Sequence, residues 1–357
     1  MKAKIAGVAI LVAVILLAVG YKIYSGNQKP QITLTGYIGS EKAGLFDDPQ
    51  IKDLLKTNYG ITVNYSTAGS FDMITADQSN RDFLFPSNEV AYDLYKQTYN
   101  KSPQNKVIFS SPLVLYTHSV VLDALKAQGI VSVQNGVNFC DMQKLTNLIV
   151  SGKKWKDIGL PDLFGNVCVY STDPEQSNSG NMYACLLASV LNGGSVVDQN
   201  SVDKVMPQLK TIFTNLGYME SSSGVLFNDF LTTGVGSKPI MIGYENQLLE
   251  FAANPDNQST WQQIKGDIKI IYPTPTMWAN HTYIALDKNG SLGITALMDS
   301  KIQALAWQNH GFRTISNTDI DGFQKVHGNL GLLKEVTQVV PLPNADTINK
   351  ILAGLKQ

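Results

Sequence analysis

The sequence has little charge and few cysteines. Charged residues make up 16% of its 357 residues, and 28 Lys and Arg residues balance 29 Asp and Glu residues. A chain with no basic excess and no basic run among aromatic residues is not expected to bind nucleic acid. The three cysteines, Cys140, Cys168 and Cys185, fit no metal-binding spacing. In an oxidising compartment Cys140 and Cys168 could form a disulfide, and three buried thiols fit the sequence equally well.

Several common active-site motifs are also missing. The four histidines lie far apart in the sequence, at His118, His281, His310 and His327. They form no HExxH pattern, and the chain has no GxSxG, GxGxxG or GxxxxGK[ST] motif. Residues 317–328 begin like a calcium-binding loop, but Gly328 stands where a bidentate Glu is needed, so we interpret the segment as a tight turn. These absences predict a protein that is not an enzyme and binds no metal or cofactor.

One long hydrophobic run is present, at the N-terminus. Two lysines precede an uncharged stretch at 5–21, whose 17 residues are near the lower limit for a membrane-spanning helix. Positive charge on this side predicts that the rest of the chain lies outside the cytoplasm, at the membrane surface. Residues 1–24 are therefore predicted to be an uncleaved signal anchor, followed by a linker at 25–30. Ala18 and Gly20 leave open a cleaved signal, which would give a secreted protein.

Predicted strands and helices alternate along the remainder of the chain. Residues 47–60 have helical spacing, with Pro49 near the start and Gly60 at the end, and the β-branched residues at 61–67 follow as a strand. This order recurs in both halves, which predicts an α/β fold. The run at 107–122 is strand-like and long enough to pass between two lobes.

The expected organisation is therefore two lobes. Lobe I begins with residues 31–117, lobe II comprises 118–280, and residues 281–357 return to lobe I and end in C-terminal helices. The crossing strands that contain SSPLVLYT (110–117) and HTYIAL (281–286) are expected to form the hinge.

Small polar turns follow several predicted strands. STDPEQSNSG at 171–180 precedes a nearly all-apolar helix, and similar turns are GSEK at 39–42, GSFD at 69–72, PSN at 86–88 and YENQ at 244–247. Ligands of open α/β sheets bind beyond the carboxyl ends of strands, where helix N-termini present backbone N–H groups. One such turn could be an ordinary helix cap. Their repetition at equivalent places predicts a ligand-binding cleft.

In order and spacing, these segments resemble the type II periplasmic (extracellular) solute-binding proteins of ABC importers. The resemblance covers most of residues 31–315, from GSEKAGLFDDPQIKDLLKTNYGITVNYSTAGSFDM through SSPLVLYT, STDPEQSNSG, IGYENQLLE and YPTPTMWANHTYIAL to MDSKIQALAWQNHGFR. Each motif is loose, and their order carries the likeness. The resulting candidate ligand contacts are Ser40, Glu41, Ser70, Ser87, Ser177, Asn178, Ser179, Tyr244 and Glu245.

The resemblance implies a two-lobed α/β receptor that closes around a small polar ligand, either an oxyanion or an organic solute, and delivers it to an ABC permease. Members of the family are commonly released or held by a lipidated Cys, whereas this chain has a hydrophobic anchor. A tethered sensor or assembly protein is therefore an alternative, and a secreted hydrolase is a weaker one. Glu41, Asp72 and Glu245 would oppose an anion unless they pair with Lys42 or point away, so the ligand class stays open.

Overall fold

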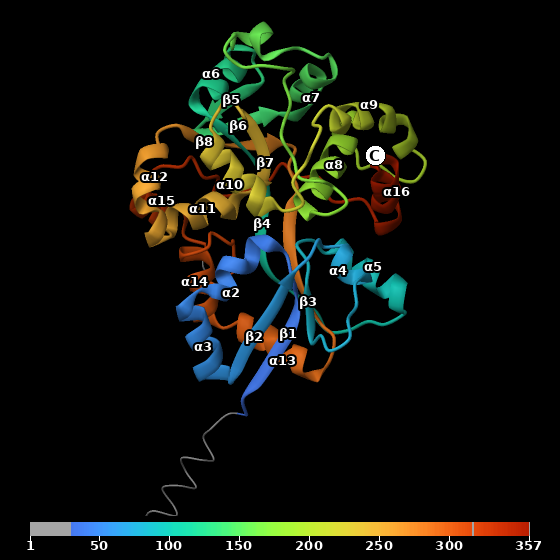
Figure 1. The fold of residues 1–357 in the computed structure, drawn as a ribbon, viewed down its shortest axis with the longest axis vertical. Coiled ribbons are helices and arrows are strands. Elements are labelled where there is room, and N and C mark those ends of the chain that lie inside the picture. The colour runs from blue at the N-terminus through green and yellow to red at the C-terminus, as the bar shows by residue number, and fades with distance from the viewer. Residues whose placement is uncertain (1–29, 316–317, 357) are drawn as a thin grey trace, which may run out of the picture.

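The computed structural model describes residues 30–315 and 318–356 and shows a chain folded into two α/β lobes (Figure 1). The predicted anchor at 1–24 lies outside the described residues, as does the predicted linker up to residue 29. Within the described ranges, no helix combines the length and the apolar character needed to cross a membrane.

Lobe I is built on a sheet with the strand order β2-β1-β3-β9-β4. Its strands are β1 (Ile32–Ile38), β2 (Ile61–Thr67), β3 (Phe83–Phe85), β9 (Trp278–Ala285) and the first half of β4 (Asn105–His118). Strand β1 runs parallel to β2 and β3, so these three strands end at the same edge. The helices of this lobe are the short 3₁₀ helix η1 (Ser40–Lys42), α2 (Ala43–Asp47), α3 (Pro49–Tyr59), α4 (Asp72–Thr75), α5 (Val90–Tyr99), α13 (Lys288–Leu297) and α14 (Ser300–Gln308).

The signals that predict a helix at 47–60 are seen directly in α3. The Asp48 side chain accepts hydrogen bonds from the backbone N–H groups of Gln50 and Ile51, and Pro49 occupies the first turn. Gly60 ends the helix with a φ of 69°, a left-handed conformation that glycine adopts without strain. The cap and the glycine set both ends of the helix, so β2 begins at Ile61.

Lobe II uses the second half of β4. Its sheet continues from β4 through β8 (Ile268–Thr274) and β6 (Val137–Asp141) to β5 (Val131–Gln134), and β7 (Ile240–Tyr244) also pairs with β4. The surrounding helices are α6 (Ser119–Ala127), α7 (Met142–Val150), η2 (Trp155–Ile158), α8 (Asn178–Leu191), α9 (Val202–Thr214), α10 (Ser223–Thr233), α11 (Glu245–Ala253), η3 (Pro255–Asn257), α12 (Gln258–Ile264), α15 (Ile320–His327) and α16 (Ala345–Leu355).

Helix α8 is the central helix of lobe II. Every residue from Asn178 to Val190 is buried, and the helix packs against α7, α9, α16 and β7. This position explains why the helix is apolar on all sides. The N-terminus of α8 nevertheless faces lobe I, and its polar first turn can form hydrogen bonds with groups outside lobe II.

Two of the segments that connect the lobes are strand β4 and the return segment before β9, which cross the middle of the molecule (Figure 1). Strand β4 pairs with β9 up to Pro112 and with β7 and β8 from Leu113 onward. The return segment is 275–277, between β8 and β9, where Pro275 has no N–H group to continue a ladder. HTYIAL at 281–286 begins inside β9, which pairs with β3 and β4 of lobe I. The return crossing therefore precedes the strand predicted to form the hinge. It also precedes the predicted boundary of lobe II at residue 280.

The C-terminal helices also differ from the predicted return to lobe I. Helix α16 packs mainly against α8 and α9 of lobe II, with a smaller contact to α5 of lobe I. Helix α15 joins the lobe II core, where Phe323 is buried and the Trp261 ring nitrogen donates to the His327 carbonyl. The chain therefore passes between the lobes a third time, after α14.

The segment at 317–328, interpreted above as a tight turn, contains helix α15. Asp319 caps this helix by accepting a hydrogen bond from the Gly322 N–H at 2.9 Å. The Phe323 ring packs against the Trp307 ring, with 5.4 Å between their centroids. The calcium-like spacing is thus a helix cap followed by a buried aromatic residue, and the turn interpretation was wrong.

All three cysteines are free thiols in the structure. Cys140 and Cys185 are buried, and Cys168 is partly buried. Burial raises the pKa of all three thiols, that of Cys168 to about 11. Such thiols stay protonated near neutral pH and are poor nucleophiles.

Candidate ligand-binding cleft

A cavity of about 360 Å³ lies where the two lobes meet. From lobe I it is lined by Gly39, Ser40, Glu41, Thr67, Ala68, Gly69, Ser70, Asp72 and Ser87, and from lobe II by Gln176, Ser177, Asn178, Ser221 and Ser222. The lobe I residues come from the turns that follow β1, β2 and β3, whose carboxyl ends share one edge of the sheet. The lobe II residues precede or begin α8 and α10. We refer to this cavity as the cleft.

Six of the nine candidate ligand contacts line the cleft. They are Ser40, Glu41, Ser70, Ser87, Ser177 and Asn178. Sequence reasoning missed Ser221 and Ser222, although they carry the same signal, a small polar turn directly before a helix. The cleft is therefore a hydroxyl-rich space to which both lobes contribute.

Ser179 and Tyr244 lie behind the cleft lining and support it. The Ser179 hydroxyl is 2.8 Å from the Thr172 hydroxyl, and this contact holds the turn before α8 against the helix. The Tyr244 hydroxyl accepts a hydrogen bond from the Asn178 side-chain amide at 2.9 Å. Burial, with the nearby Glu41 charge, raises the pKa of Tyr244, so its phenol stays protonated. Both residues position Asn178 and its turn.

Glu245 faces away from the cleft and is fully buried. Its carboxylate accepts two hydrogen bonds from Arg313, from Nε to Oε2 at 2.6 Å and from Nη2 to Oε1 at 2.8 Å. The Tyr272 hydroxyl donates to the same carboxylate. Burial alone would lower the pKa of Arg313, but Glu245 outweighs burial and keeps the guanidinium charged. This bidentate pair fixes the start of α11 against the segment at 333–334, whose carbonyls accept two further Arg313 N–H groups.

Glu41 forms the floor of the cleft together with a buried cluster behind it. The Lys42 ammonium contacts Glu41 Oε1 and donates to Ser87 Oγ at 2.7 Å, and His281 Nδ1 accepts from it at 3.0 Å. The Ser87 hydroxyl donates to Glu41 Oε1 as well. Lys42, Ser87 and His281 have no exposed surface. Local sequence signals identify Glu41 and Ser87, whereas His281 arrives from β9, far along the chain.

The charges in this cluster are set by burial and by each other. Burial alone would raise the pKa of Glu41, but Lys42 and His281 outweigh it and hold this pKa well below its usual range. Burial lowers the pKa of Lys42, and Glu41 opposes that effect. Burial and then the Lys42 charge lower the pKa of His281 to about 4, so this imidazole is neutral at pH 7. The floor thus holds one carboxylate and one ammonium that neutralise each other.

The lobes touch directly around the cleft. The Asn88 amide of lobe I donates to Asn178 Oδ1 of lobe II, and Asn178 Nδ2 donates to the Ser87 carbonyl at 3.2 Å. At the other end, the Ser222 hydroxyl donates to Ser40 Oγ at 3.0 Å. The structure therefore shows a closed arrangement of the two lobes.

A charged contact joins the lobes beside the cleft. His310 of lobe I lies 3.0 Å from Asp48 Oδ2 in the same lobe and 2.8 Å from Glu250 Oε1, which projects from α11 of lobe II. Burial would lower the pKa of His310, but hydrogen bonds to Asp48 and Glu250 raise it to about 9. The imidazolium is therefore charged at neutral pH and links the two carboxylates.

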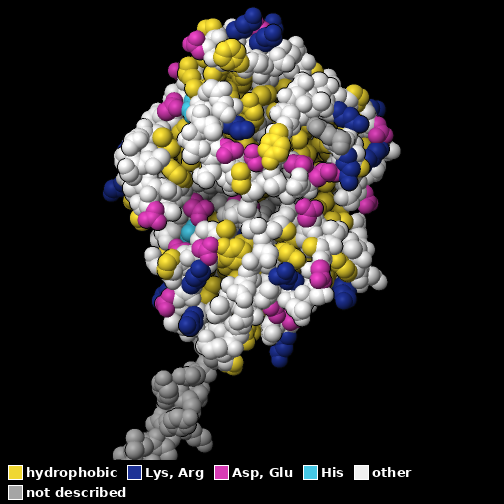
Figure 2. Space-filling model, viewed as in Figure 1, with side chains coloured by type: hydrophobic (Ala, Val, Ile, Leu, Met, Phe, Trp, Pro, Cys, Tyr) yellow, Lys and Arg dark blue, Asp and Glu magenta, His cyan; other side chains and the backbone are white. Residues whose placement is uncertain are grey.

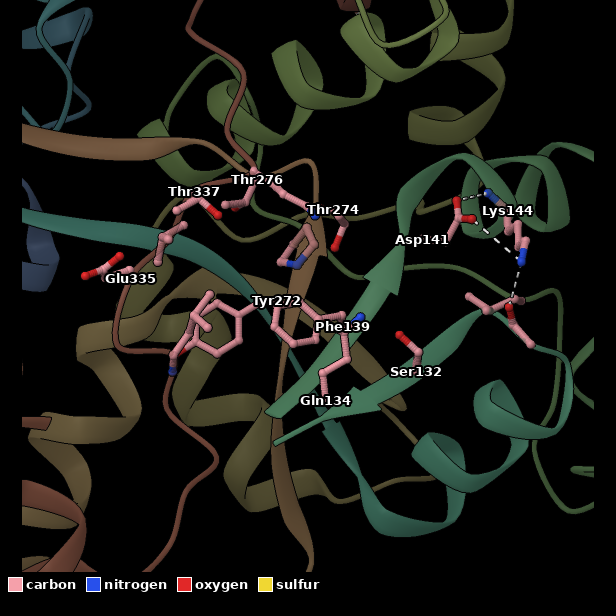
Figure 3. Close-up of a pocket in the computed structure, with 16 residues that line it drawn as sticks. Ser132, Gln134, Phe139, Asp141, Lys144, Tyr272, Thr274, Thr276, Glu335 and Thr337 are labelled. Atoms are coloured by element: carbon pink, nitrogen blue, oxygen red, sulfur yellow. Dashed lines mark hydrogen bonds and ion pairs between the residues drawn. The ribbon is translucent and has the colours of Figure 1, made fainter. Parts of the chain in front are cut away.

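A second cavity of about 500 Å³ lies on lobe II, away from the serine turns (Figure 3). Tyr272 and Phe139 line one side of it, and Asp141 and Lys144 lie on the other. Asp141 caps α7 by accepting from the Lys144 backbone N–H at 3.0 Å. None of the candidate ligand contacts lines this cavity, and it is walled by lobe II and the segment at 333–338. The cleft remains the candidate site because both lobes build it.

Comparison with known proteins identifies the fold. No family model matches the chain, and no curated protein does so either. An ABC-transporter protein from Listeria monocytogenes assigned to spermidine/putrescine superposes with a TM-score of 0.58 at 12% identity, covering 91% of this chain and 99% of that one. The substrate-binding protein of an ABC transporter from Agrobacterium tumefaciens gives 0.56 at 15% identity, covering 93% and 96%.

A third solved structure, the sulfate-binding protein SubI from Mycobacterium tuberculosis, gives a TM-score of 0.51 at 14% identity, covering 91% of this chain and 95% of that one. The three matches extend over nearly the full length of each chain, and the low identities restrict the conclusion to the fold. The chain therefore has the mixed α/β fold of the periplasmic solute-binding proteins of ABC transporters, as the sequence resemblance predicted.

Proposed function

We propose that this chain is an extracellular solute-binding protein that closes its lobes around a small polar ligand and delivers it to an ABC-type importer. One observation carries the proposal: serine-bearing turns from both lobes meet in a single cleft between lobes that crossing strands connect. The likeness in fold to solute-binding proteins of ABC transporters supports it. The cleft volume lies in the range that suits a small organic ligand.

Closure follows from where the lining groups lie. Ser40 and Ser70 belong to lobe I and Ser177 and Ser222 to lobe II, so only the closed form presents all four hydroxyls to one ligand. A ligand shifts the equilibrium toward this form by the difference between its affinities for the closed and open forms. The segment at 275–277 and the middle of β4 absorb the rotation. A membrane partner then recognises the closed form, and the predicted anchor at 1–24 keeps the lobes beside the membrane.

The names of the compared proteins do not agree on a ligand class. One is assigned to spermidine/putrescine and another is a sulfate-binding protein. The proposed ligand is therefore a small polar solute, either an oxyanion or an organic molecule.

Hydrolysis has little support from the cleft. Ser87 lies next to Lys42, but the Lys42 ammonium is engaged by Glu41 and His281, so it is not a free base. A general base must be able to accept the serine proton. A tethered sensor would use the same cleft and the predicted anchor, and a genetic neighbourhood without a permease and an ATPase would favour it.

The test is ligand-induced stabilisation of the full-length chain in detergent, with oxyanions, sugars, amino acids, amines and organic acids. A ligand at a hundredfold excess over its Kd adds about 2.7 kcal/mol to stability, which a thermal melt detects easily. We expect one class to stabilise the chain and the double variant Ser70→Ala/Ser177→Ala to abolish the shift. The control variant Ser102→Ala/Ser195→Ala changes two exposed serines outside the cleft and should retain it. Chemical turnover of the bound solute would contradict the proposal.

A further inference from the structure

The charges that line the cleft identify the class of its ligand, if the cleft is a solute-binding site as proposed above. Among the described lining residues there are two carboxylates, Glu41 and Asp72, and no Lys, Arg or His. Lys42 is the nearest cation behind the lining, and it has no exposed surface. Its charge is already neutralised by Glu41. An anion in the cleft would therefore meet no unpaired cation.

Glu41 retains the capacity to accept a hydrogen bond. The contacts from Lys42, Ser87 and His281 all reach its Oε1 atom. No hydrogen bond from a described residue reaches Oε2. A carboxylate can only accept hydrogen bonds when it is ionised, so the floor of the cleft offers an acceptor.

Asp72 stands at the mouth of the cleft, exposed to solvent there, with no ion pair or side-chain hydrogen bond from the described ranges. Its pKa is raised, first by partial burial and then by the carboxylates of Glu175 and Asp173. Asp72 belongs to lobe I, whereas Asp173 and Glu175 belong to the turn before α8 in lobe II. Closing the lobes thus brings like charges together, which is unfavourable, and a positive charge between them would relieve the repulsion. Figure 2 shows acidic side chains along the waist between the lobes.

The partners of the lobe II carboxylates only partly offset this charge. Glu175 lies 3.2 Å from Lys356, but the Lys356 side chain is largely exposed and that of Glu175 is partly exposed. Such a surface pair contributes little. Asp173 accepts from the Gln176 amide at 2.7 Å, which satisfies an oxygen but brings no positive charge. The described partners of Asp72 and Asp173 therefore supply no positive charge at the mouth.

The donors of the cleft are neutral hydroxyl and amide groups, and some of them are already used within the protein. Ser87 gives its hydroxyl proton to Glu41, and Asn178 uses its amide on Ser87 and Tyr244. The positive potential at the N-termini of α8 and α10 favours an anion, but each helix terminus is equivalent to only about half a unit charge. The unpaired carboxylates outweigh it. Serine oxygens, in contrast, can accept hydrogen bonds as readily as donate them.

We infer that the cleft binds a small solute that carries one or more ammonium groups, in preference to an oxyanion. Its N–H groups would donate to Asp72, to Glu41 Oε2 and to serine oxygens, and its charge would relieve the repulsion that closure creates across the mouth. Of the two ligand classes proposed above, the inference therefore favours an organic solute over an oxyanion.

The test is titration calorimetry of the full-length chain in detergent with four probes: diaminobutane as the ammonium-bearing solute, sulfate, phosphate, and sorbitol as a neutral polyol. We expect diaminobutane alone to bind, with an affinity that falls as ionic strength rises. Asp72→Asn should weaken this binding about tenfold or more, the usual effect of removing a close opposite charge. Asp123→Asn makes the same charge change on an exposed side chain of α6 and should leave the affinity unchanged.

The remaining outcomes separate the inference from the proposed function. Sulfate or phosphate binding that Asp72→Asn strengthens would overturn the ammonium class and leave a solute-binding protein. Sorbitol binding that is indifferent to salt and to Asp72→Asn would do the same. If none of the four probes binds, the ammonium inference fails, and a broader panel that also fails to stabilise the chain would overturn the proposed function.

Discussion

Glu41 and Glu245 look equivalent in the sequence but have different roles in the structure. Each comes shortly after a strand, β1 for Glu41 and β7 for Glu245, and each is buried beside a cation. Arg313 engages both oxygens of Glu245, so nothing is left for a ligand. Lys42 contacts Glu41 through one oxygen only, and the other remains able to accept. The geometry of the cation therefore distinguishes a structural glutamate from one that can bind a solute.

The Arg313→Ala variant tests the structural role of Glu245 and should lower the free energy of unfolding more than any other variant. It leaves Glu245 buried with the Tyr272 hydroxyl as its remaining partner, and an uncompensated buried charge costs about 5 kcal/mol. Urea unfolding of the variant and the wild type measures the difference in free energy. The double variant Glu245→Gln/Arg313→Met removes both charges and should recover part of the loss. A single variant within about 1 kcal/mol of wild type would contradict this role.

The Lys42→Met variant tests the role of Glu41. It leaves Glu41 without its ammonium, at a cost of about 3 kcal/mol, at the lower end of the range for a buried pair. The loss is smaller than for Arg313 because Ser87 still donates to Glu41, and because His281 can take up a proton once the Lys42 charge no longer lowers its pKa. Unlike Arg313→Ala, this variant should also weaken solute binding when measured on folded protein. Unchanged affinity would place Glu41 outside the ligand contacts.

The local part of the site could be predicted from the sequence, and the long-range part could not. Turns such as GSEK and GSFD are visible because small residues directly follow a β-branched strand, and the structure brings Ser40 and Ser70 together in the cleft. The orientation of the Glu245 side chain depends on its ion pair with Arg313, which lies 68 positions away in the sequence. No spacing rule connects these two residues.

The same distinction holds for the fold. The helix at 47–60 was predicted correctly because its cap and its terminal glycine are local signals. The return crossing was misplaced because the residues at 278–286 are strand-like throughout, and pairing with β3 and β4 decides to which lobe they belong. Helix α16 was assigned to the return part of the chain, yet its apolar face packs on α8 and α9, a tertiary contact that its own sequence does not specify.

A third glutamate, the partly buried Glu250, extends the comparison to the contact between the lobes. His310 Nδ1 donates to Glu250 and Nε2 donates to Asp48, and the pKa of His310 is raised to about 9 from an ordinary value near 6.5. Because the folded pKa is the higher one, the stabilisation is complete below about pH 6.5 and is lost as the pH rises through 9. We expect the free energy of unfolding to fall by about 3 kcal/mol across this window.

Urea unfolding at three pH values across that window measures the slope. His310→Gln removes the titrating group, so its stability should vary less with pH than that of the wild type. A wild-type slope equal to that of His310→Gln would show that the contact does not hold a proton. Solute affinity should weaken over the same interval, because Glu250 and His310 lie on different lobes.

The smallest expected effect comes from changing the fit between the lobes without changing any charge. A Cβ atom at Gly69 would lie 2.5 Å from the Gln176 carbonyl oxygen, a backbone atom of lobe II that cannot move aside easily. Gly69→Ala should therefore hold the lobes slightly apart and weaken solute binding about tenfold, or 1.4 kcal/mol, with little change in stability. At Gly44 the added atom would meet the end of the flexible Glu250 side chain, so Gly44→Ala should weaken binding less. Equal affinities for Gly69→Ala and the wild type would mean that the ligand does not require this closed arrangement.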